Sequence, residues 1–523
     1  MLLFAILAVC VLPIQMWTDA MPKFGSGINF QNVLTLILLV GWKISTARQG
    51  RKMLSPSEPN KWLGLYLGWS FLALFYGVLF APVQLPLSMS DERFIHWKDE
   101  ATGLFMFFIV ANTLKDEKAI KRLLFCMCLL TPYIINVYYK QYHAPTSLKT
   151  AQLQPDEVVL DDDIGNNTGH PYAPYFKLDD KPLFDDEHSM SVTDWEGRKY
   201  EVQPTSYNPR VVRIFGYDRR SGRVLNVKFH QDRGSGAAAA QEFSWDLKEI
   251  TGVFTQIGSN EMAAFYANAF LFMVGMLVCY RSVGWRVYLL FNMALLGWGL
   301  IFSLSRGAWL AICAGVGYLG ARKSKGLMIA FVGFIFLAPA LMPGSVTSRA
   351  SGGMDDSASH RLDFWKWAAV AGTIRFPLGV GYQCYIPRHQ EETGIKLDTH
   401  NFFFRTLAEM GLIGLALVIL LLRAAFRTGW KLFLEGKNGF QRGVGLGAAL
   451  LVIGNAVSNM FGDRFSYVSL GCFMWAFIGM AARLNTINAA AAKEEAERNK
   501  ARPSATPSHE MVPSAAARLG APT

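Results

Sequence analysis

Residues 402–422 read FFFRTLAEMGLIGLALVILLL. About 20 mostly apolar residues are what an α-helix needs to cross the roughly 30 Å of hydrocarbon in a bilayer. Similar segments recur along the chain, at 1–17, 28–46, 61–82, 99–114, 122–140, 261–280, 287–304, 307–321, 327–342, 402–422, 443–461 and 465–482. The sequence therefore predicts an all-α polytopic membrane protein with about twelve transmembrane helices.

The composition agrees with lipid as the main solvent. Hydrophobic residues make up 51% of the chain and charged residues 17%, whereas ordinary soluble domains are about 25% charged. A net charge of +11 would suit a nucleic-acid partner, but the basic residues lie mostly in short loops between apolar segments. The sequence contains no basic stripe interleaved with aromatic residues. We expect a lipid bilayer, and no nucleic acid, among the partners.

The distribution of lysine and arginine predicts the topology. Basic residues cluster in alternate loops, which positions these loops on the cytoplasmic side: Arg48, Arg51, Lys52 and Lys61; Lys115, Lys118, Lys121 and Arg122; Arg281 and Arg286; Arg322, Lys323 and Lys325; Arg423, Arg427, Lys431, Lys437 and Arg442. The short outer loops hold isolated basic residues such as Lys23, Arg93 and Arg464. Both termini are therefore expected in the cytoplasm, and the two long loops on the outer face.

These patterns divide the chain into six parts. We expect transmembrane helices at 1–140, an extracytoplasmic insertion at 141–260, central transmembrane helices at 261–342, a second extracytoplasmic loop at 343–401, C-terminal transmembrane helices at 402–482, and a cytoplasmic tail at 483–523 that is disordered apart from a short helix at 488–498. The insertion begins acidic and rich in turns. Residues 210–230 then alternate apolar and polar side chains around Arg219-Arg220-Ser221-Gly222, which predicts a β-hairpin. The insertion is expected to be small and partly β.

An arginine at membrane depth marks the first candidate for chemistry. Ser303-Leu304-Ser305-Arg306-Gly307-Ala308-Trp309 lies at the junction of two apolar segments. A charge in this position is costly and is by default a functional candidate. The alternative is an arginine that only separates two helices in a loop.

A second candidate opens an amphipathic stretch in the second outer loop. Arg361 and Trp365 are four residues apart and share one face of a helix. Pro377-Leu378-Gly379-Val380-Gly381 follows as a turn. Such a helix could also lie in the membrane interface with its aromatic residues at headgroup level, without a catalytic role.

The third candidate is His400-Asn401 at the outer mouth of the 402–422 segment. Histidine exchanges a proton near neutral pH, so His400 is a candidate general base. A single histidine at a membrane interface can equally be a polar anchor.

The three motifs together resemble one family. S-x-S-R-G-A-W, R-x-x-x-W followed by P-L-G-x-G, and H-N-x9-G-L-I-G occur in this order. This arrangement resembles the O-antigen ligase and polymerase superfamily, whose ligases carry H-(N/S/Q)-x9-G-x-x-(G/T/V). His400, Asn401, Gly411 and Gly414 match that pattern position by position. The resemblance covers residues 250–480, including a family-like segment at 252–263, and the first 140 residues only in general character. The acidic part of the insertion has no counterpart.

The resemblance implies an integral membrane glycosyltransferase of GT-C-type architecture in the bacterial inner membrane. Such enzymes take a glycan from undecaprenyl diphosphate and pass it to an acceptor hydroxyl on the periplasmic face, with inversion and without a metal or cofactor. Arg306 and Arg361 would then neutralise the leaving diphosphate, and His400 would act as base. Asn401 would orient the histidine or a sugar hydroxyl, and Trp365 would stack on sugar or polyprenyl.

The acceptor stays open, as lipid A core, the growing glycan, or a protein serine. The H-N-x9-G pattern favours ligases over polymerases, but protein O-oligosaccharyltransferases share it. Outside the enzymes, a transporter, a membrane receptor or an export-complex scaffold would also be polytopic. A proton-coupled transporter is expected to carry charges near mid-bilayer on several helices, whereas the charges singled out above fall at the outer boundary.

Overall fold

The computed structural model describes residues 2–11, 30–48, 50, 52–79, 91–142, 258–303, 305–323, 356–396 and 398–501, and seven short strands between Lys149 and Lys248. The expected span at 327–342 and residues 502–523 of the tail lie outside the described residues, as does most of the acidic part of the insertion.

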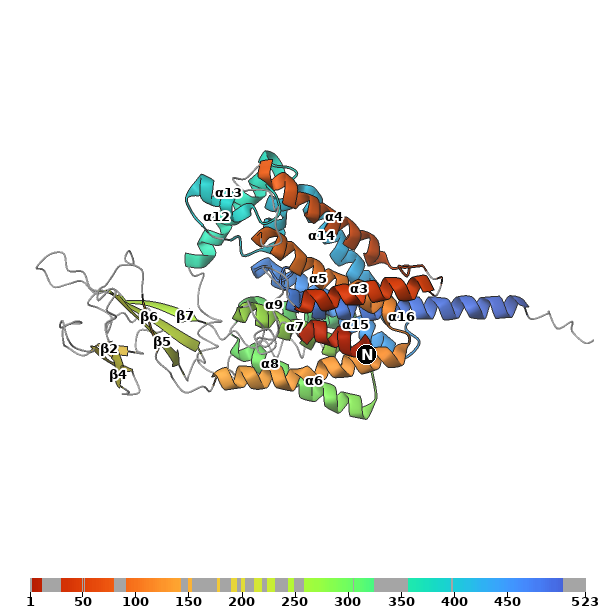
Figure 1. The fold of residues 1–523 in the computed structure, drawn as a ribbon. Helices are drawn as coiled ribbons and strands as arrows, with labels where there is room; N and C mark the ends of the chain where they lie inside the picture. Colours follow the sequence, from red (N-terminus) through yellow and green to blue (C-terminus); the bar gives the residue numbers. More distant parts are fainter. Residues whose placement is uncertain are drawn as a thin grey trace, which may run out of the picture.

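Helices make up most of the described chain (Figure 1). They are α1 (Leu2–Val11), α3 (Phe30–Arg48), α4 (Glu58–Tyr76), α5 (Glu92–Thr113), α6 (Glu117–Tyr142), α7 (Ser259–Cys279), α8 (Val283–Phe302), α9 (Arg306–Lys323), α12 (Asp356–Val370), α13 (Tyr385–Thr393), α14 (Phe402–Glu435), α15 (Gly439–Ser458) and α16 (Val468–Ala501). Three shorter helical segments are η1 (Gly77–Leu79), η3 (Ala371–Arg375) and η4 (Asn459–Phe461).

Among the described residues, eight helices are long and apolar enough to cross a membrane. They are the helices containing Phe30–Arg48, Glu58–Leu79, Glu117–Tyr139, Asn260–Cys279, Val283–Phe302, Phe402–Glu435, Gly439–Phe461 and Val468–Asn499. The multi-pass helical architecture is thus confirmed.

The expected count of about twelve spans is not confirmed, for physical reasons that differ between segments. In helix α1 the structure describes 10 residues, about half of the number that crosses a bilayer. Helices α5 and α9 lie where spans are expected at 99–114 and 307–321, but their ends carry several charges. Much of α5 is buried among other helices, so protein rather than lipid surrounds it.

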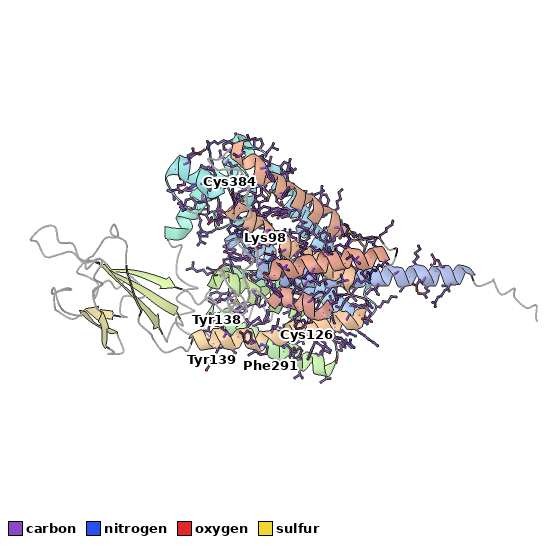
Figure 2. All side chains as sticks on the ribbon, in the orientation of Figure 1. Lys98, Cys126, Tyr138, Tyr139, Phe291 and Cys384 are labelled. Carbon is purple, nitrogen blue, oxygen red and sulfur yellow. The ribbon has the colours of Figure 1, made fainter. Side chains whose placement is uncertain are left out.

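Small residues let the central helices approach closely. A Cβ built on Gly275 of α7 would lie 2.2 Å from the Gly447 nitrogen of α15, and one on Gly103 of α5 would lie 3.1 Å from the Gly471 Cα of α16. Close contact of backbones at glycine is a common way to pack helices in membranes, where the hydrophobic effect does not drive helices together. At the edge of the bundle, Tyr138 and Tyr139 of α6 both contact Trp298 of α8 (Figure 2).

The insertion contains two antiparallel sheets. One has the strand order β1-β5-β6-β7 (Lys149–Gln152, Val211–Asp218, Arg223–His230, Phe243–Lys248), and the other has β2-β3-β4 (Phe176–Leu178, Met190–Asp194, Lys199–Val202). Strands β5 and β6 pair from Val211–His230 to Asp218–Arg223. This antiparallel pairing agrees with the β-hairpin that the sequence predicts over residues 210–230, although residues 219–222 themselves lie outside the described residues. Its extracytoplasmic location stays a prediction.

The close contact of α7 with α15 gives a test of the packing. We expect Gly275→Ala to destabilise the protein by about 1–3 kcal/mol, because the added methyl group forces the two backbones apart. Gly68→Ala in α4 is the matched control, since a Cβ there meets nothing within 4 Å. Thermal unfolding in detergent measures both. An unchanged midpoint for Gly275→Ala would contradict this packing.

Candidate active site

His400 occupies a tight turn immediately before α14. Its φ is +49°, a left-handed conformation that costs a residue with a Cβ roughly 1–2 kcal/mol. The turn is held from both sides: the Thr399 hydroxyl accepts a hydrogen bond from the Asn401 N–H (3.2 Å) and donates one to the Asn401 carbonyl (3.0 Å). The His400 side chain is exposed. A strained residue that presents an exposed imidazole is a candidate for function.

Asn401 caps α14. Its side-chain oxygen accepts hydrogen bonds from the N–H groups of Phe403 (3.0 Å) and Phe404 (3.2 Å), which would otherwise lack partners in the first turn. The residue is 3% exposed. The structure thus gives Asn401 a structural task, fixing where the helix begins next to His400. Its expected contact with a sugar hydroxyl stays a prediction.

Trp365 joins α12 to the same turn. Its indole N–H donates to the Thr399 carbonyl (2.9 Å), and its ring stacks on Phe404 at 5.3 Å between centroids. Arg361 lies one helical turn before Trp365 on the same face of α12. The tryptophan therefore docks α12, and with it Arg361, beside His400. Its expected stacking on sugar or polyprenyl stays a prediction.

The P-L-G-x-G turn packs into a break in α14. Gly411 has φ +65° and ψ −166°, so the helix is interrupted there. The carbonyls of Ala408 and Glu409 instead accept hydrogen bonds from the N–H groups of Val380 (2.8 Å) and Gly381 (2.9 Å). A Cβ on Gly411 would lie 2.0 Å from the Pro377 carbonyl oxygen. A Cβ on Gly379 would lie 2.2 Å from the Glu409 carbonyl oxygen. Each motif therefore has a glycine where the other segment's backbone leaves no room for a side chain.

A buried carboxyl fixes the other side of this turn. Glu100 of α5 accepts hydrogen bonds from the hydroxyls of Tyr66 in α4 and Tyr382 (2.5 Å for Tyr382). The Tyr382 N–H donates to the Ala73 carbonyl (3.1 Å). The turn is thereby attached to α4, α5 and α14 at once.

The surroundings of His400 favour the neutral imidazole, chiefly through desolvation. Although the side chain is exposed, the packed segments remove part of its hydration, and this desolvation lowers the pKa of His400 below its ordinary value of 6.5. Arg361 and Arg464 also lower this pKa, whereas Asp398 and Glu261 act in the opposite direction. At neutral pH the imidazole can therefore accept a proton.

The sequence does not predict the ion pair between Arg464 and Glu261. Their side chains form an ion pair between the turn after η4 and the first turn of α7. A Cβ on Gly462 would lie 2.5 Å from Nη1 of Arg464, so glycine makes room for the guanidinium. The sequence shows Arg464 only as one basic residue of a short outer loop. Its partner is 203 residues away, and no local pattern links the two.

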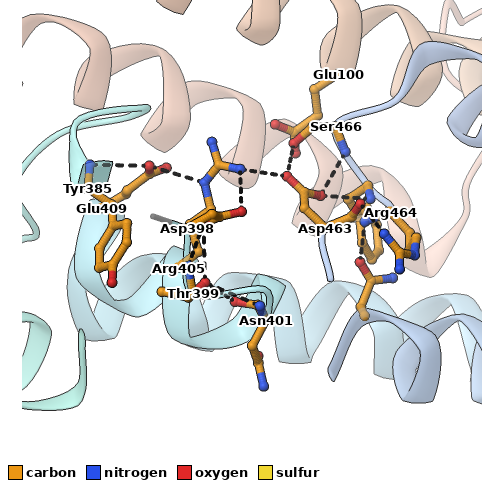
Figure 3. A network of polar contacts seen from close by, with 12 residues as sticks. Glu100, Tyr385, Asp398, Thr399, Asn401, Arg405, Glu409, Asp463, Arg464 and Ser466 are labelled. Carbon is orange, nitrogen blue, oxygen red and sulfur yellow. Dashed lines mark hydrogen bonds and ion pairs between the residues drawn. The ribbon is translucent and has the colours of Figure 1, made fainter. Parts of the chain in front are cut away.

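A second arginine lies at the centre of a larger buried network (Figure 3). Arg405, in the first turn of α14, contacts Asp398, Glu409 and Asp463. The available sequence signal was a charged pair spaced i, i+4 inside a segment that is apolar enough to cross a membrane.

Arg306 begins α9, and its motif forms the joint between α8 and α9. The Ser303 hydroxyl and the Trp309 indole N–H both donate to the Leu300 carbonyl, at 2.7 and 3.0 Å. The neighbouring Gly307 packs on Phe461, with its built Cβ at 3.0 Å from the Phe461 Cβ. Arg306 thus lies at the end of α9 that packs against η4. Phe461, the last residue of η4, precedes Arg464 by three residues.

The structure therefore brings four of the five predicted site residues together directly, namely His400, Asn401, Trp365 and Arg361. Arg306 is connected through the packing of Gly307 on η4. The roles of all five stay proposals.

The fold and this site define a multi-pass helical membrane protein in which two arginines and two carboxylates act on one histidine. Residues 291–419 match the protein family described as O-antigen ligase, and this stretch contains the five predicted site residues. This match confirms the resemblance to the O-antigen ligase-like superfamily over that stretch and indicates a ligase- or polymerase-type membrane function. No curated protein matches the chain.

The charges around His400 predict its titration. We expect His400 to titrate below pH 6.5, and Glu261→Gln to lower this pKa further, because the substitution removes an anion that favours the imidazolium and leaves Arg464 without its counter-ion. Diethyl pyrocarbonate reacts with neutral imidazole, so the pH dependence of His400 modification, read by mass spectrometry, reports its pKa.

Glu391→Gln is the matched control, since Glu391 pairs with Arg388 on α13 and should leave the titration unchanged. A pKa that rises in Glu261→Gln would contradict this description of the site.

Proposed function

We propose that this protein is a membrane glycosyltransferase that moves a glycan from undecaprenyl diphosphate to an acceptor hydroxyl on the periplasmic face, as O-antigen ligases do. The observation that supports this proposal most strongly is His400: an exposed imidazole, held in a strained turn and kept neutral, with Arg361 beside it. A base next to a cation is what transfer from a diphosphate-linked donor needs.

The proposed reaction is a single displacement. The neutral His400 takes the proton from the acceptor hydroxyl while the hydroxyl oxygen forms a bond with the anomeric carbon of the glycan. The bond from that carbon to the diphosphate oxygen breaks, and undecaprenyl diphosphate leaves with the electron pair. One displacement inverts the anomeric centre. The imidazolium then returns its proton to water.

Arginine suits the leaving group. Its planar guanidinium donates two parallel hydrogen bonds to phosphate oxygens and stays charged at all relevant pH values. We assign Arg361, which docks beside His400 through Trp365, to the diphosphate. Arg306 at the start of α9 is the second proposed ligand. Neutralisation by these two cations makes a metal ion unnecessary in the proposed mechanism.

The acceptor is proposed by class only, as lipid A core, a growing glycan, or a protein hydroxyl. The H-N-x9-G pattern favours a ligase-type acceptor over polymerisation, so lipid A core in lipopolysaccharide synthesis is the first candidate. The transporter alternative receives no support from the charges of the described helices. Arg405 and Glu409 lie in the first turns of α14, at the end next to His400.

The test uses the purified protein with undecaprenyl-diphosphate glycan and each acceptor, without divalent metal. We expect wild-type transfer, and a loss of about 10²–10⁴-fold in His400→Ala because general-base catalysis is removed. His230→Ala, in β6 of the insertion, controls for loss of a histidine elsewhere. Unfolding temperature and donor binding establish that each variant is intact.

Two results would count against the proposal. Equal transfer by the wild type and His400→Ala would remove His400 from the mechanism. A wild type that transfers to no acceptor would overturn the enzymatic function itself.

A further inference from the structure

We infer that Arg405 is a positioning residue for His400, which holds the histidine turn and the Arg464 turn at a fixed separation. This inference rests on the proposed function, in which His400 is the base. It concerns a residue at one of the nine unspecified positions of the H-N-x9-G motif.

The contacts of Arg405 join three separate segments (Figure 3). Its Nη1 lies 3.1 Å from Oδ2 of Asp463 and 3.8 Å from Oδ2 of Asp398. Its Nε lies 3.2 Å from Oε1 of Glu409, one turn further along α14. The planar fork of one guanidinium thus links the loop before His400, the helix after it, and the turn that carries Arg464.

Most of this network is nearly closed to water, while Asp398, with its side chain 24% exposed, lies closer to the surface. The side chains of Arg405, Glu409 and Asp463 are 12%, 5% and 9% exposed. Buried ion pairs contribute little net stability, because desolvation offsets most of the attraction, and their value often lies in fixing one geometry. The geometry fixed here is that of the two turns beside the imidazole.

The path from Arg405 to His400 is short. Asp398, which pairs with Arg405, accepts a hydrogen bond from the Thr399 N–H (2.7 Å). The Thr399 hydroxyl in turn bonds both the N–H and the carbonyl of Asn401, and His400 lies between these two residues in the chain. The left-handed backbone of His400 persists only if its surroundings over-determine it. Arg405 provides this restraint from one side of the turn, and the Trp365 indole from another.

The other arm of the network fixes Arg464. Asp463 accepts hydrogen bonds from the N–H groups of Phe465 (3.0 Å) and Ser466 (3.1 Å), and from the Ser466 hydroxyl (2.5 Å). These bonds close the turn next to Arg464, whose charge acts on His400. Arg405 therefore sets the position of the histidine and of a cation that influences it.

The same contacts separate Arg405 from the proposed diphosphate ligands. Three carboxylates surround its guanidinium, so a diphosphate would have to displace them. We therefore place Arg405 outside the substrate-contacting group that contains Arg361.

A double-mutant cycle tests the inference. Arg405→Lys keeps the charge but replaces the fork by a point charge, which cannot hold three carboxylates in the same geometry. We expect kcat to fall roughly 10- to 100-fold, as for a small displacement of a catalytic group, with little change in the KM for donor. In the His400→Ala background the same substitution should have no further effect. The control, Arg427→Lys, alters an exposed pair with Glu58 at the other end of α14 and should change neither background.

A loss of the same size in both backgrounds would show that Arg405 acts on the fold in general, and would overturn the inference. Where residual transfer is too low to measure, or the wild type transfers nothing and the proposed function fails, the rate of His400 modification by diethyl pyrocarbonate at pH 7 decides. A rate changed several-fold in Arg405→Lys but not in Arg427→Lys supports positioning, and an unchanged rate contradicts it.

Discussion

Arg405 carries a permanent charge in the first turn of a helix that is otherwise apolar enough to cross a membrane. Such a charge is tolerated only where protein supplies counter-ions, and the three carboxylates that do so come from different parts of the chain. Because Asp463 is 58 residues away in sequence, satisfying this one charge brings two loops together at the mouth of α14. The histidine turn is built on that junction.

The break at Gly411 complements this constraint. The interruption of α14 leaves the carbonyls of Ala408 and Glu409 without helical partners. The N–H groups of Val380 and Gly381 donate hydrogen bonds to them instead. In this segment of α14, the side chains form the ion-pair network and the backbone carbonyls bond the loop at 380–381. The end of the bundle next to His400 is thereby fixed by contacts from several segments, and these contacts hold the strained histidine turn. In the proposed mechanism Arg361 binds the substrate, whereas Arg405 positions the histidine turn.

The sequence predicts the multi-pass helical class well, because runs of apolar residues such as 402–422 have few alternatives. The expected count of spans is not confirmed, and one reason is α5, where Lys98, Asp99 and Glu100 lie in a helix that is largely buried. At the site, the motifs identify His400, Arg361 and Trp365, and the structure places them together. Neither the Arg464–Glu261 pair nor the partners of Arg405 could be predicted, since a single sequence does not show which distant charges meet. Asn401 and Trp365 also prove to have structural hydrogen bonds that their motif does not reveal.

The central claim is that a diphosphate-linked donor binds between Arg361 and His400 while the Arg405 network stays intact. A cryo-EM structure with undecaprenyl diphosphate, the proposed product, tests it most directly. The account predicts the diphosphate on Arg361 and next to the His400 imidazole, with Arg405 still held by Asp398, Glu409 and Asp463. A diphosphate bound away from His400, or one that takes Arg405 from its carboxylates, would contradict it.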